Sequence, residues 1–559
     1  MTSTTPLTSM YLHPSKWDQH FTPLCVHDMF FQTVERMQSA SLADFMGRKY
    51  SYAEMADSVR RFARGLQLRG IGKGDRVGLF LPNVPHYITA YYGAMLAGAT
   101  VVNFSPLYTV DELAHQVADS GTSILVTVSA AALLPTAIKV LDQSNLGQLI
   151  VGSVAEALPR MKSWAYRLFK KADIAPIPAD GRITPFADFL ANDGASTPVA
   201  CDPANDVAVL QYTGGTTGTP KGAMLSHQNI TANARQINAI DPHSYANKPD
   251  AQTDDRILGV LPFFHVFANA TVLNRTVNNG GEIVMLPRFE ATAALKAAHR
   301  KQVTAIPGVP TMYQALLDNA QLPKTDFSAL RACISGGAPL PAELKTKFEA
   351  VSKAVLIEGY GLTESSGVIS CNPYEGENRV GSIGQPVPGT LVKLVDKEDP
   401  TKPVQPGEPG ELLCAGPQIM LGYWGKPKET ADVFMDGYLR TGDVATIDDD
   451  GFIYIVDRLK DMIAVGGFKV FPSQIEDILY RHPAVKEALV IGITDSYLGE
   501  RPQAFVTIND QIDGTELLAW LNPQLGKHER VCEVVVRDAL PKTMIGKLDR
   551  KALRAEVGA

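Results

Sequence analysis

Tyr212-Thr-Gly-Gly-Thr-Thr-Gly-Thr-Pro-Lys-Gly-Ala-Met-Leu-Ser-His227 is the most distinctive stretch of this 559-residue chain. It follows the apolar run VAVLQ (207–211), which predicts a buried strand. Its glycines let the backbone turn tightly and approach a ligand, while its threonines and Lys221 offer hydroxyl donors and a positive charge. It does not fit the G-x-x-x-x-G-K-[ST] pattern of a Walker A loop. The alternative is an ordinary Gly/Thr turn, but the density of donors favours a loop that wraps phosphates.

Strand-like and helix-like segments alternate around this loop. Upstream, RVGLFLP (76–82), a helical segment (85–96) and TVVNF (100–104) follow one another. This order is typical of βαβ units and predicts parallel sheets with helices. Residues 77–110 lack Asp, Glu, Lys and Arg, but prolines and asparagines interrupt them before an apolar span of membrane length is reached.

The pattern changes twice toward the C-terminus. Residues 384–457 contain short strands separated by Gly, Pro and Asp turns, which predicts a β-rich subdomain. After DRLKD (457–461), strands and helices of a small α+β unit follow. We therefore predict a large α/β N-terminal domain of residues 1–457, with parallel sheets, helices and the β-rich subdomain. A small, mobile α+β C-terminal domain of residues 458–559 follows it.

Composition excludes several classes of protein. Hydrophobic residues make up 45% and charged residues 20%, which is a globular balance and not that of a disordered chain. The net charge of −7 argues against a nucleic-acid binder. Six cysteines without a C-x-x-C pair predict neither a disulfide framework nor a zinc site. They indicate a reduced, cytoplasmic setting. The N-terminus lacks the basic and apolar regions of a secretory signal.

Residues 158–173, LPRMKSWAYRLFKKAD, interrupt the alternation with a basic amphipathic segment. Leu158, Met161, Trp164 and Leu168 are spaced as on one helix face. One interpretation is a helix that touches a membrane surface. The other is a surface helix packed on its own domain, because basic amphipathic patterns are common and not specific.

Six further segments accompany the threonine loop in a fixed order: LPFFHVF (261–267), SGGAPL (335–340), EGYGLTE (358–364), GYLRTGD (437–443), DRLKDMIAVGGFKVFPSQIE (457–476) and LPKTMIGK (540–547). Together the seven motifs resemble those of the acyl-adenylate-forming superfamily, the AMP-binding enzymes, from about residue 30 to residue 556. Within that superfamily the chain looks most similar to bacterial medium- and long-chain fatty acid–CoA ligases.

The resemblance implies an AMP-forming acid–thiol ligase. A fatty acid and ATP would give acyl-AMP and pyrophosphate, and coenzyme A (CoA) would then take the acyl group and release AMP. Alternatives within the superfamily are an aryl- or dicarboxylate–CoA ligase, or acyl adenylation for a separate carrier protein. A non-catalytic nucleotide sensor is an alternative of another class. The implied ligands are ATP, Mg²⁺, CoA and a carboxylic acid, and a homodimer is expected by analogy.

The first step needs positioning and charge neutralisation more than a base, because a carboxylate is already anionic at neutral pH. By resemblance the catalytic residues are Lys547, Glu364, His265 and Thr213, with Thr213 and Glu364 linked to Mg²⁺. Read alone, Glu364 is a surface acid in a turn, His265 a core residue and Lys547 a solvated lysine.

The resemblance also implies a nucleotide site and a second set of residues for the thiol step. The residues expected to bind ATP and AMP are Thr213, Gly214, Gly215, Thr216, Thr217, Gly218, Lys221, Gly336, Gly337, Ala338, Glu358, Gly359, Tyr360, Gly361, Thr363, Asp443, Arg458 and Lys547. Lys460 resembles a hinge about which the small domain rotates between the two steps. Gly466, Gly467 and Phe468 would then approach CoA; the alternative for these residues is an ordinary β-turn.

Overall fold

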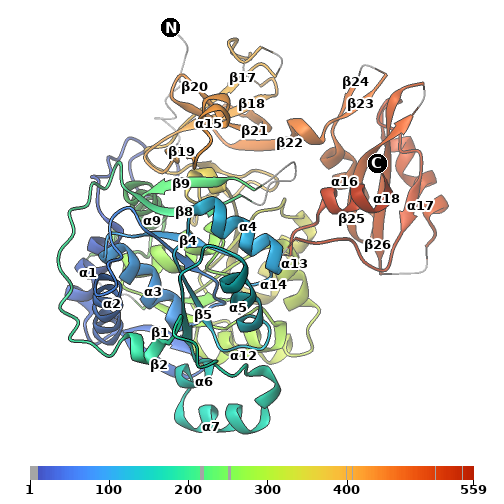
Figure 1. The fold of residues 1–559 in the computed structure, drawn as a ribbon. Coiled ribbons are helices and arrows are strands. Elements are labelled where there is room, and N and C mark those ends of the chain that lie inside the picture. Colours follow the sequence, from blue (N-terminus) through green and yellow to red (C-terminus); the bar gives the residue numbers. More distant parts are fainter. Residues whose placement is uncertain are drawn as a thin grey trace.

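The fold is built on two large sheets, a small antiparallel sheet and a separate C-terminal unit (Figure 1). A computed structural model describes residues 11–213, 220–249, 254–397, 399–405, 407–466, 468–495, 497–509, 512–543 and 546–558.

The first large sheet carries the strand that leads into the threonine loop. Its order is β19-β9-β8-β4-β3-β5-β6-β7, with antiparallel pairs only at β8–β9 and β9–β19. The strands are β3 (Arg76–Leu79), β4 (Thr100–Asn103), β5 (Ile124–Val128), β6 (Gln148–Gly152), β7 (Ile183–Pro185), β8 (Val207–Tyr212), β9 (Gly222–Ser226) and β19 (Gly422–Tyr423).

The second large sheet is parallel in its centre and antiparallel at its edges, in the order β16-β15-β14-β13-β12-β10-β11-β1-β2. The strands are β1 (Ser41–Phe45), β2 (Arg48–Ser51), β10 (Arg256–Gly259), β11 (Glu282–Met285), β12 (Ala305–Gly308), β13 (Ala332–Gly336), β14 (Val355–Tyr360), β15 (Ser370–Cys371) and β16 (Gln385–Pro386).

Two smaller sheets complete the described strands, as the Gly- and Pro-punctuated sequence predicts. An antiparallel sheet contains β17 (Leu391–Val395), β18 (Gly410–Ala415), β20 (Phe434–Met435), β21 (Tyr438–Ile447) and β22 (Ile453–Arg458). The C-terminal sheet contains β23 (Ile463–Val465), β24 (Phe468–Val470), β25 (Val485–Asp495), β26 (Gly499–Ile508) and β27 (Val534–Val536). This last sheet has a hydrophobic core of its own, distinct from the main one.

Helices accompany the sheets throughout. They are α1 (Val26–Met37), α2 (Tyr52–Gln67), α3 (Pro85–Leu96), α4 (Val110–Ser120), α5 (Leu134–Gln143), α6 (Val154–Ala157), α7 (Arg160–Phe169), α8 (Phe186–Phe189), α9 (His227–Ile240), α10 (Val266–Ala268), α11 (Arg275–Asn279), α12 (Ala291–Lys301), α13 (Pro310–Leu317), α14 (Ala342–Ser352), α15 (Pro427–Val433), α16 (Pro472–Leu479), α17 (Gly514–Leu521) and α18 (Arg550–Val557). A π-helical turn, η2 (Asn269–Asn274), and a 3₁₀ turn, η5 (Leu459–Asp461), are also present.

Helix α3 joins the two large sheets. It is apolar on all sides and almost completely buried, which explains the absence of charge in this stretch of sequence. The Tyr87 hydroxyl donates to Asn103 Oδ1 at 2.7 Å in the first sheet and lies 3.0 Å from the Phe263 carbonyl beside the second. The uncharged stretch of sequence therefore forms a buried helix of the domain. Among the described helices, none is long and apolar enough to cross a bilayer.

The prediction that no cysteines are paired is wrong. Cys25, which precedes α1, forms a disulfide with Cys201, which lies in the turn before β8. The two residues are 176 positions apart, and their Cα atoms lie 6.7 Å from each other. Helix α1 packs against α2, α3, α9 and α11, and the pairing depends on this packing, so no local spacing could reveal it.

Candidate active site

A cavity of about 1480 Å³ lies where the second large sheet, the small antiparallel sheet and the C-terminal unit meet. Most residues expected from the sequence line it. They are Thr213, His265, Gly336, Gly337, Ala338, Glu358, Gly359, Tyr360, Gly361, Thr363, Glu364, Asp443, Arg458, Lys460 and Lys547.

Lys547 reaches this cavity from the far end of the chain. Its side chain lies so close to Gly337 that a Cβ added there would stand 2.2 Å from Lys547 Cε and 2.6 Å from Nζ. Gly337 has φ +82, a left-handed conformation that glycine adopts easily. The preceding residue, Gly546, accepts a hydrogen bond at 3.0 Å from the Thr311 hydroxyl, which fixes the segment against α13.

Asp443, Arg458 and Tyr360 form a connected polar group on the opposite wall. Asp443 lies in β21 and pairs in register with Arg458 of β22. The Arg458 Nε lies 3.2 Å from Asp443 Oδ1, and the Tyr360 hydroxyl at the end of β14 donates to Asp443 Oδ2. Asp443 is only 3% exposed, so its carboxylate is held rigidly as an acceptor beside a flat aromatic ring.

Glu364 is oriented by a residue that the sequence reasoning did not identify. The Tyr423 hydroxyl of β19 donates to Glu364 Oε1 at 2.7 Å. The Lys221 Nζ lies 4.6 Å from the centre of the Tyr423 ring, so one tyrosine links the acid and the loop lysine. The Thr213 amide donates to the Lys221 carbonyl at 2.9 Å, which joins the two strand ends on either side of the loop.

Close backbone approaches shape the floor of the cavity. A Cβ on Gly361 would lie 1.5 Å from the Gly367 carbonyl oxygen, so no other residue fits there without moving the chain. The Glu358 carboxylate accepts from the Leu340 amide at 3.2 Å, and burial raises its pKa to about 8. Glu358 therefore acts within the wall of the site and carries a proton more readily than an exposed glutamate.

His265 lies at the start of α10, where its Nδ1 accepts from the Phe267 amide at 3.2 Å. Burial lowers its pKa to about 3, with Lys547 as a second cause, so the imidazole is neutral at pH 7. A neutral ring beside the cavity supplies an apolar edge and not a charge. The π-helical turn that follows, η2, is a feature often found at functional sites.

The residues expected for the thiol step lie elsewhere. Gly466 and the 61% exposed Phe468 are not among the residues that line the cavity, whereas Lys460 is. Phe468 stacks on His528 instead, with ring centres 5.1 Å apart. Gly467 and the loop residues Gly214, Gly215, Thr216, Thr217 and Gly218 lie outside the described residues.

Tyr423 and Thr311 are the contacts that sequence reasoning missed. Both act from segments with no distinctive spacing of their own. For Tyr423, the only available signal was that GYWGKP (422–427) follows a segment predicted to form strands. This did not indicate that its partner is Glu364.

We expect acyl-AMP formation to fall as the pH rises above about 8. Burial, with a smaller contribution from Arg458, lowers the pKa of Lys547 to about 8, against the opposing effect of Asp443. A lysine is cationic below its pKa, so the ammonium is present at pH 7 and is lost near pH 8, well below the pH at which an exposed lysine loses its proton. The measurement is kcat/KM for pyrophosphate release between pH 7 and 9.5. Its pH dependence reports the pKa values of groups in the free protein.

Glu358 titrates in the same range and requires its own control. If Lys547 causes the fall, the Glu358→Gln variant should show the same decrease in kcat/KM above about pH 8. The Lys547→Ala variant, which reacts more slowly, should show no such decrease. A fall that survives in Lys547→Ala contradicts the assignment.

The chain is similar to known proteins over most of its length. Residues 30–424 match the AMP-binding enzyme family, and residues 474–547 match the AMP-binding enzyme C-terminal domain. A long-chain-fatty-acid–CoA ligase of Bacillus subtilis (strain 168) is 40% identical, over 94% of this chain and 93% of that protein. A feruloyl-CoA synthase of Amycolatopsis sp. is 36% identical, over 92% and 95%. The crystal structure of ATP-bound MatB from Rhodopseudomonas palustris has a TM-score of 0.82 at 27% identity, over 95% of this chain and 99% of that one.

Proposed function

Because the chain belongs to the AMP-binding enzyme family, we propose that it activates a fatty acid with ATP and transfers the acyl group to CoA. The first step gives acyl-AMP and pyrophosphate, and the second gives acyl-CoA and AMP. The observation that carries this proposal is the position of Lys547, whose ammonium lies against Gly337 in the cavity that Asp443 and Arg458 also line.

In the first step a fatty acid carboxylate attacks the α-phosphorus of ATP and pyrophosphate leaves. The Lys547 ammonium draws the two anions together and neutralises charge that develops on the α-phosphate. Asp443 accepts from the ribose hydroxyls, Arg458 supports that carboxylate, and the Tyr360 ring faces the adenine. Lys221, Thr213 and the glycines that follow it hold the phosphates.

Glu364 and Thr213 are suited to hold Mg²⁺. A carboxylate fixed by the Tyr423 hydroxyl and a threonine hydroxyl are hard oxygen ligands of the kind this cation takes, together with phosphate oxygens. When bound, the cation would neutralise charge on the phosphates.

For the second step we propose that residues 458–559 rotate about Lys460. Lys547 then leaves the cavity, and the exposed Gly466 and Phe468, with Gly467 between them in the sequence, turn toward it to guide the CoA thiol. His265 lies beside the site of attack and serves as a neutral gate. The separate hydrophobic core of the C-terminal unit supports rotation as one body.

The class of acid separates the leading proposal from its alternatives. The similarity to a feruloyl-CoA synthase at 36% identity favours an aryl acid as the second candidate. Acyl-CoA formation should be measured with CoA across fatty acids from short to long, aryl acids and dicarboxylates. The highest kcat/KM with long fatty acids supports the proposal; turnover of aryl acids alone contradicts it, and acyl-AMP formation without thioester points to a separate carrier.

We further propose that α7 binds an anionic membrane surface. The face predicted from the sequence does not pack on the domain: Met161 is 86%, Trp164 67% and Leu168 55% exposed, and only Leu158, before the helix, is buried. Arg160, Lys162, Arg167, Lys170 and Lys171 flank these side chains. Basic charge around exposed aromatic and aliphatic groups suits the headgroup region of a bilayer. In Figure 1, α7 projects away from the C-terminal unit.

Reversing two of these charges, in Arg167→Glu with Lys170→Glu, should weaken binding to vesicles of anionic lipid at least tenfold, because each basic residue near such a surface contributes about 1 kcal/mol. Sedimentation with vesicles measures this. The matched control reverses the exposed pair Lys296 and Arg300 on α12 and should bind as the unchanged protein does. Equal loss in both variants contradicts a specific role for α7.

The cytoplasmic location and the homodimer stay predictions. Sedimentation equilibrium tests the homodimer.

A further inference from the structure

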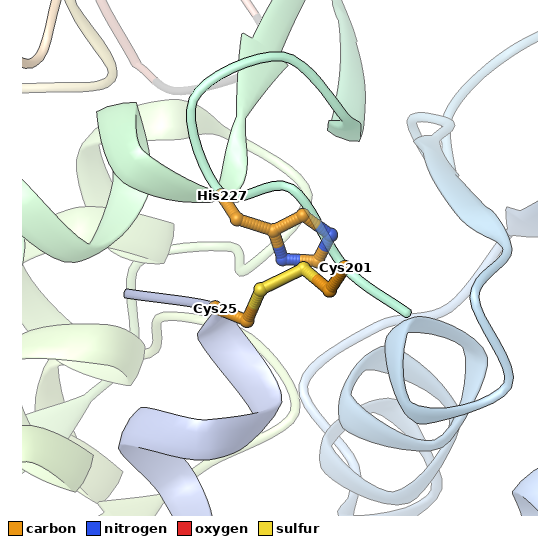
Figure 2. Close-up of side chains that lie close together, drawn as sticks. All are labelled: Cys25, Cys201 and His227. Atoms are coloured by element: carbon orange, nitrogen blue, oxygen red, sulfur yellow. A yellow bond between two sulfur atoms is a disulfide. The ribbon is translucent and has the colours of Figure 1, made fainter. Parts of the chain in front are cut away.

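The disulfide between Cys25 and Cys201 lies beside a buried histidine. Figure 2 shows that Cys25, Cys201 and His227 come together from three separate segments. Their sulfur and ring nitrogen atoms lie within 4.8 Å of one another. His227 Nδ1 accepts from the Val26 amide at 3.2 Å, so a hydrogen bond ties the first turn of α1 to the start of α9, while the disulfide ties the residue before α1 to the segment before β8.

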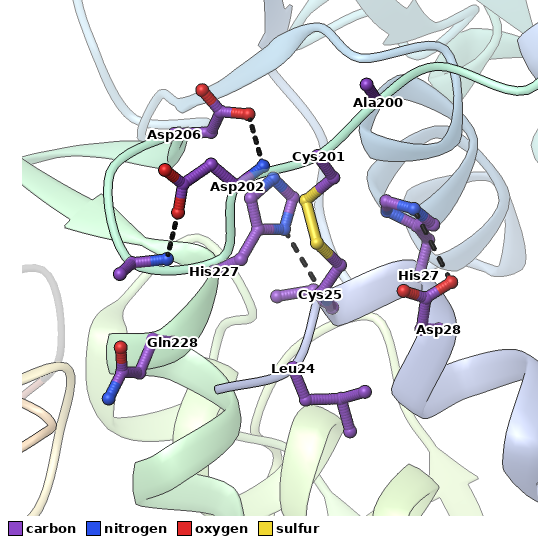
Figure 3. The surroundings of a disulfide bond; sticks show 12 residues. Leu24, Cys25, His27, Asp28, Ala200, Cys201, Asp202, Asp206, His227 and Gln228 are labelled. Carbon is purple, nitrogen blue, oxygen red and sulfur yellow. Dashed lines mark hydrogen bonds and ion pairs between the residues drawn. A yellow bond between two sulfur atoms is a disulfide. The ribbon is translucent and has the colours of Figure 1, made fainter. Parts of the chain in front are cut away.

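This cluster is located at the base of the hairpin whose tip is the threonine loop. Strands β8 and β9 form the hairpin, with Val207 opposite Ser226 at its base, and residues 213–221 connect them at the other end. The turn that contains Cys201 is bound to the start of α9: the Gln228 amide donates to the Pro203 carbonyl at 2.6 Å and the His227 amide to the Asp206 carbonyl at 3.3 Å. Figure 3 shows these segments around the sulfur atoms.

The two cysteines differ in the way that thiol–disulfide exchange requires. Cys201 is half-buried and can be reached by a small thiol, whereas Cys25 is 3% exposed. Cys25 is also the residue that caps the N-terminus of α1, where the helix dipole stabilises a thiolate. Cys201 is therefore the point of attack, and Cys25, at the N-terminus of α1, is the leaving group.

We propose that Cys25 and Cys201 form a reversible redox pair that controls how firmly the base of the hairpin is held, and with it Thr213, which follows β8 and lines the cavity. A thiolate of a small dithiol attacks Cys201 Sγ, the bond between the two protein sulfurs breaks, and Cys25 leaves as a thiolate. The second thiol of the dithiol then closes its own disulfide and releases Cys201. Two electrons pass from the dithiol to the protein, and both cysteines take up a proton.

Reduction should leave the protein folded but loosen the base of the hairpin. The hydrogen bonds from Val26, Gln228 and His227 remain after the covalent bond is gone, and both large sheets are unaffected. Only the covalent restraint between α1 and the hairpin base is lost. We expect weaker ATP binding, since a less fixed Thr213 must be ordered at the cost of binding energy.

The test compares the oxidised and the reduced wild-type protein, so it requires no variant that might fail to fold. After incubation with dithiothreitol, peptide mass spectrometry of alkylated protein should show Cys25 and Cys201 newly labelled. The Kd for ATP, measured by calorimetry, should rise at least threefold and return on reoxidation. Calorimetry does not depend on the acid used, so failure of the proposed function, seen as no pyrophosphate release with any acid, is a distinct result.

Two variants sharpen the comparison. Cys201→Ser should bind ATP as the reduced protein does under both conditions, and Cys532→Ser, which removes a half-buried cysteine of the C-terminal unit, should respond as the wild type. Full alkylation of Cys25 and Cys201 before any reductant is added overturns the proposal. So does an ATP Kd that is identical in the two states, and so does stoichiometric zinc on the reduced cysteines, which would make the cluster a metal site.

Discussion

Lys547→Ala lowers the rate of acyl-AMP formation by about 10²–10³-fold, the loss expected when one preorganised charged donor is removed from a reaction centre. The residue contacts Gly337 at the cavity, and Gly546 holds its segment against Thr311, so the ammonium is placed before substrate arrives. Because the variant keeps Asp443 and Arg458, ATP should still bind. Pyrophosphate release in a single turnover, with ATP saturating, measures the effect on chemistry.

The second half-reaction distinguishes a mobile lysine from a structural one. In the proposed rotation Lys547 leaves the cavity before CoA attacks. Thioester formation from supplied acyl-AMP should therefore fall less than threefold, which is a much smaller loss than in the first step. Lys551→Ala, an exposed lysine of α18, is the matched control and should affect neither step. Equal losses in both half-reactions of Lys547→Ala contradict rotation and indicate a general loss of structure.

The sequence was most informative where local chemistry decides structure. The helix predicted over 85–96 coincides with α3, because Pro85 occupies its first turn and apolar residues fill every side. The alternation of strands and helices likewise predicted the parallel centres of both large sheets. The turn-rich stretch from 384 formed short antiparallel strands, and the segments after 461 formed a small α+β unit.

Contacts between distant segments could not be predicted in the same way. The pairing of Cys25 with Cys201 depends on how α1 packs against its neighbouring helices, and the bond from Tyr423 to Glu364 depends on β19 joining the first large sheet. Neither pair has a spacing that identifies its partner. The basic amphipathic segment shows a related limit: the helical period was read correctly, but periodicity does not say whether the apolar face meets the domain or solvent, and here Trp164 faces solvent.

Gly337→Ala should impair acyl-AMP formation about 100-fold by displacing the Lys547 side chain. The added Cβ would stand 2.2 Å from Lys547 Cε, and φ +82 is unfavourable for alanine. The lysine side chain is flexible and can move aside, but its ammonium then no longer occupies the place from which it would act. Thioester formation from supplied acyl-AMP should be spared, because Lys547 has left by then. Pyrophosphate release and thioester formation are again the two measurements.

A double variant tests whether the collision is the cause. If Gly337→Ala acts by displacing Lys547, it should add little to the loss already seen in Lys547→Ala, because residues that act as a unit are strongly non-additive. Gly437→Ala controls for backbone conformation, since Gly437 has φ +80 and a Cβ there would meet nothing within 4 Å. Full additivity in the double variant, or an equal loss in Gly437→Ala, would assign the effect to backbone strain and remove Gly337 from the adenylation geometry.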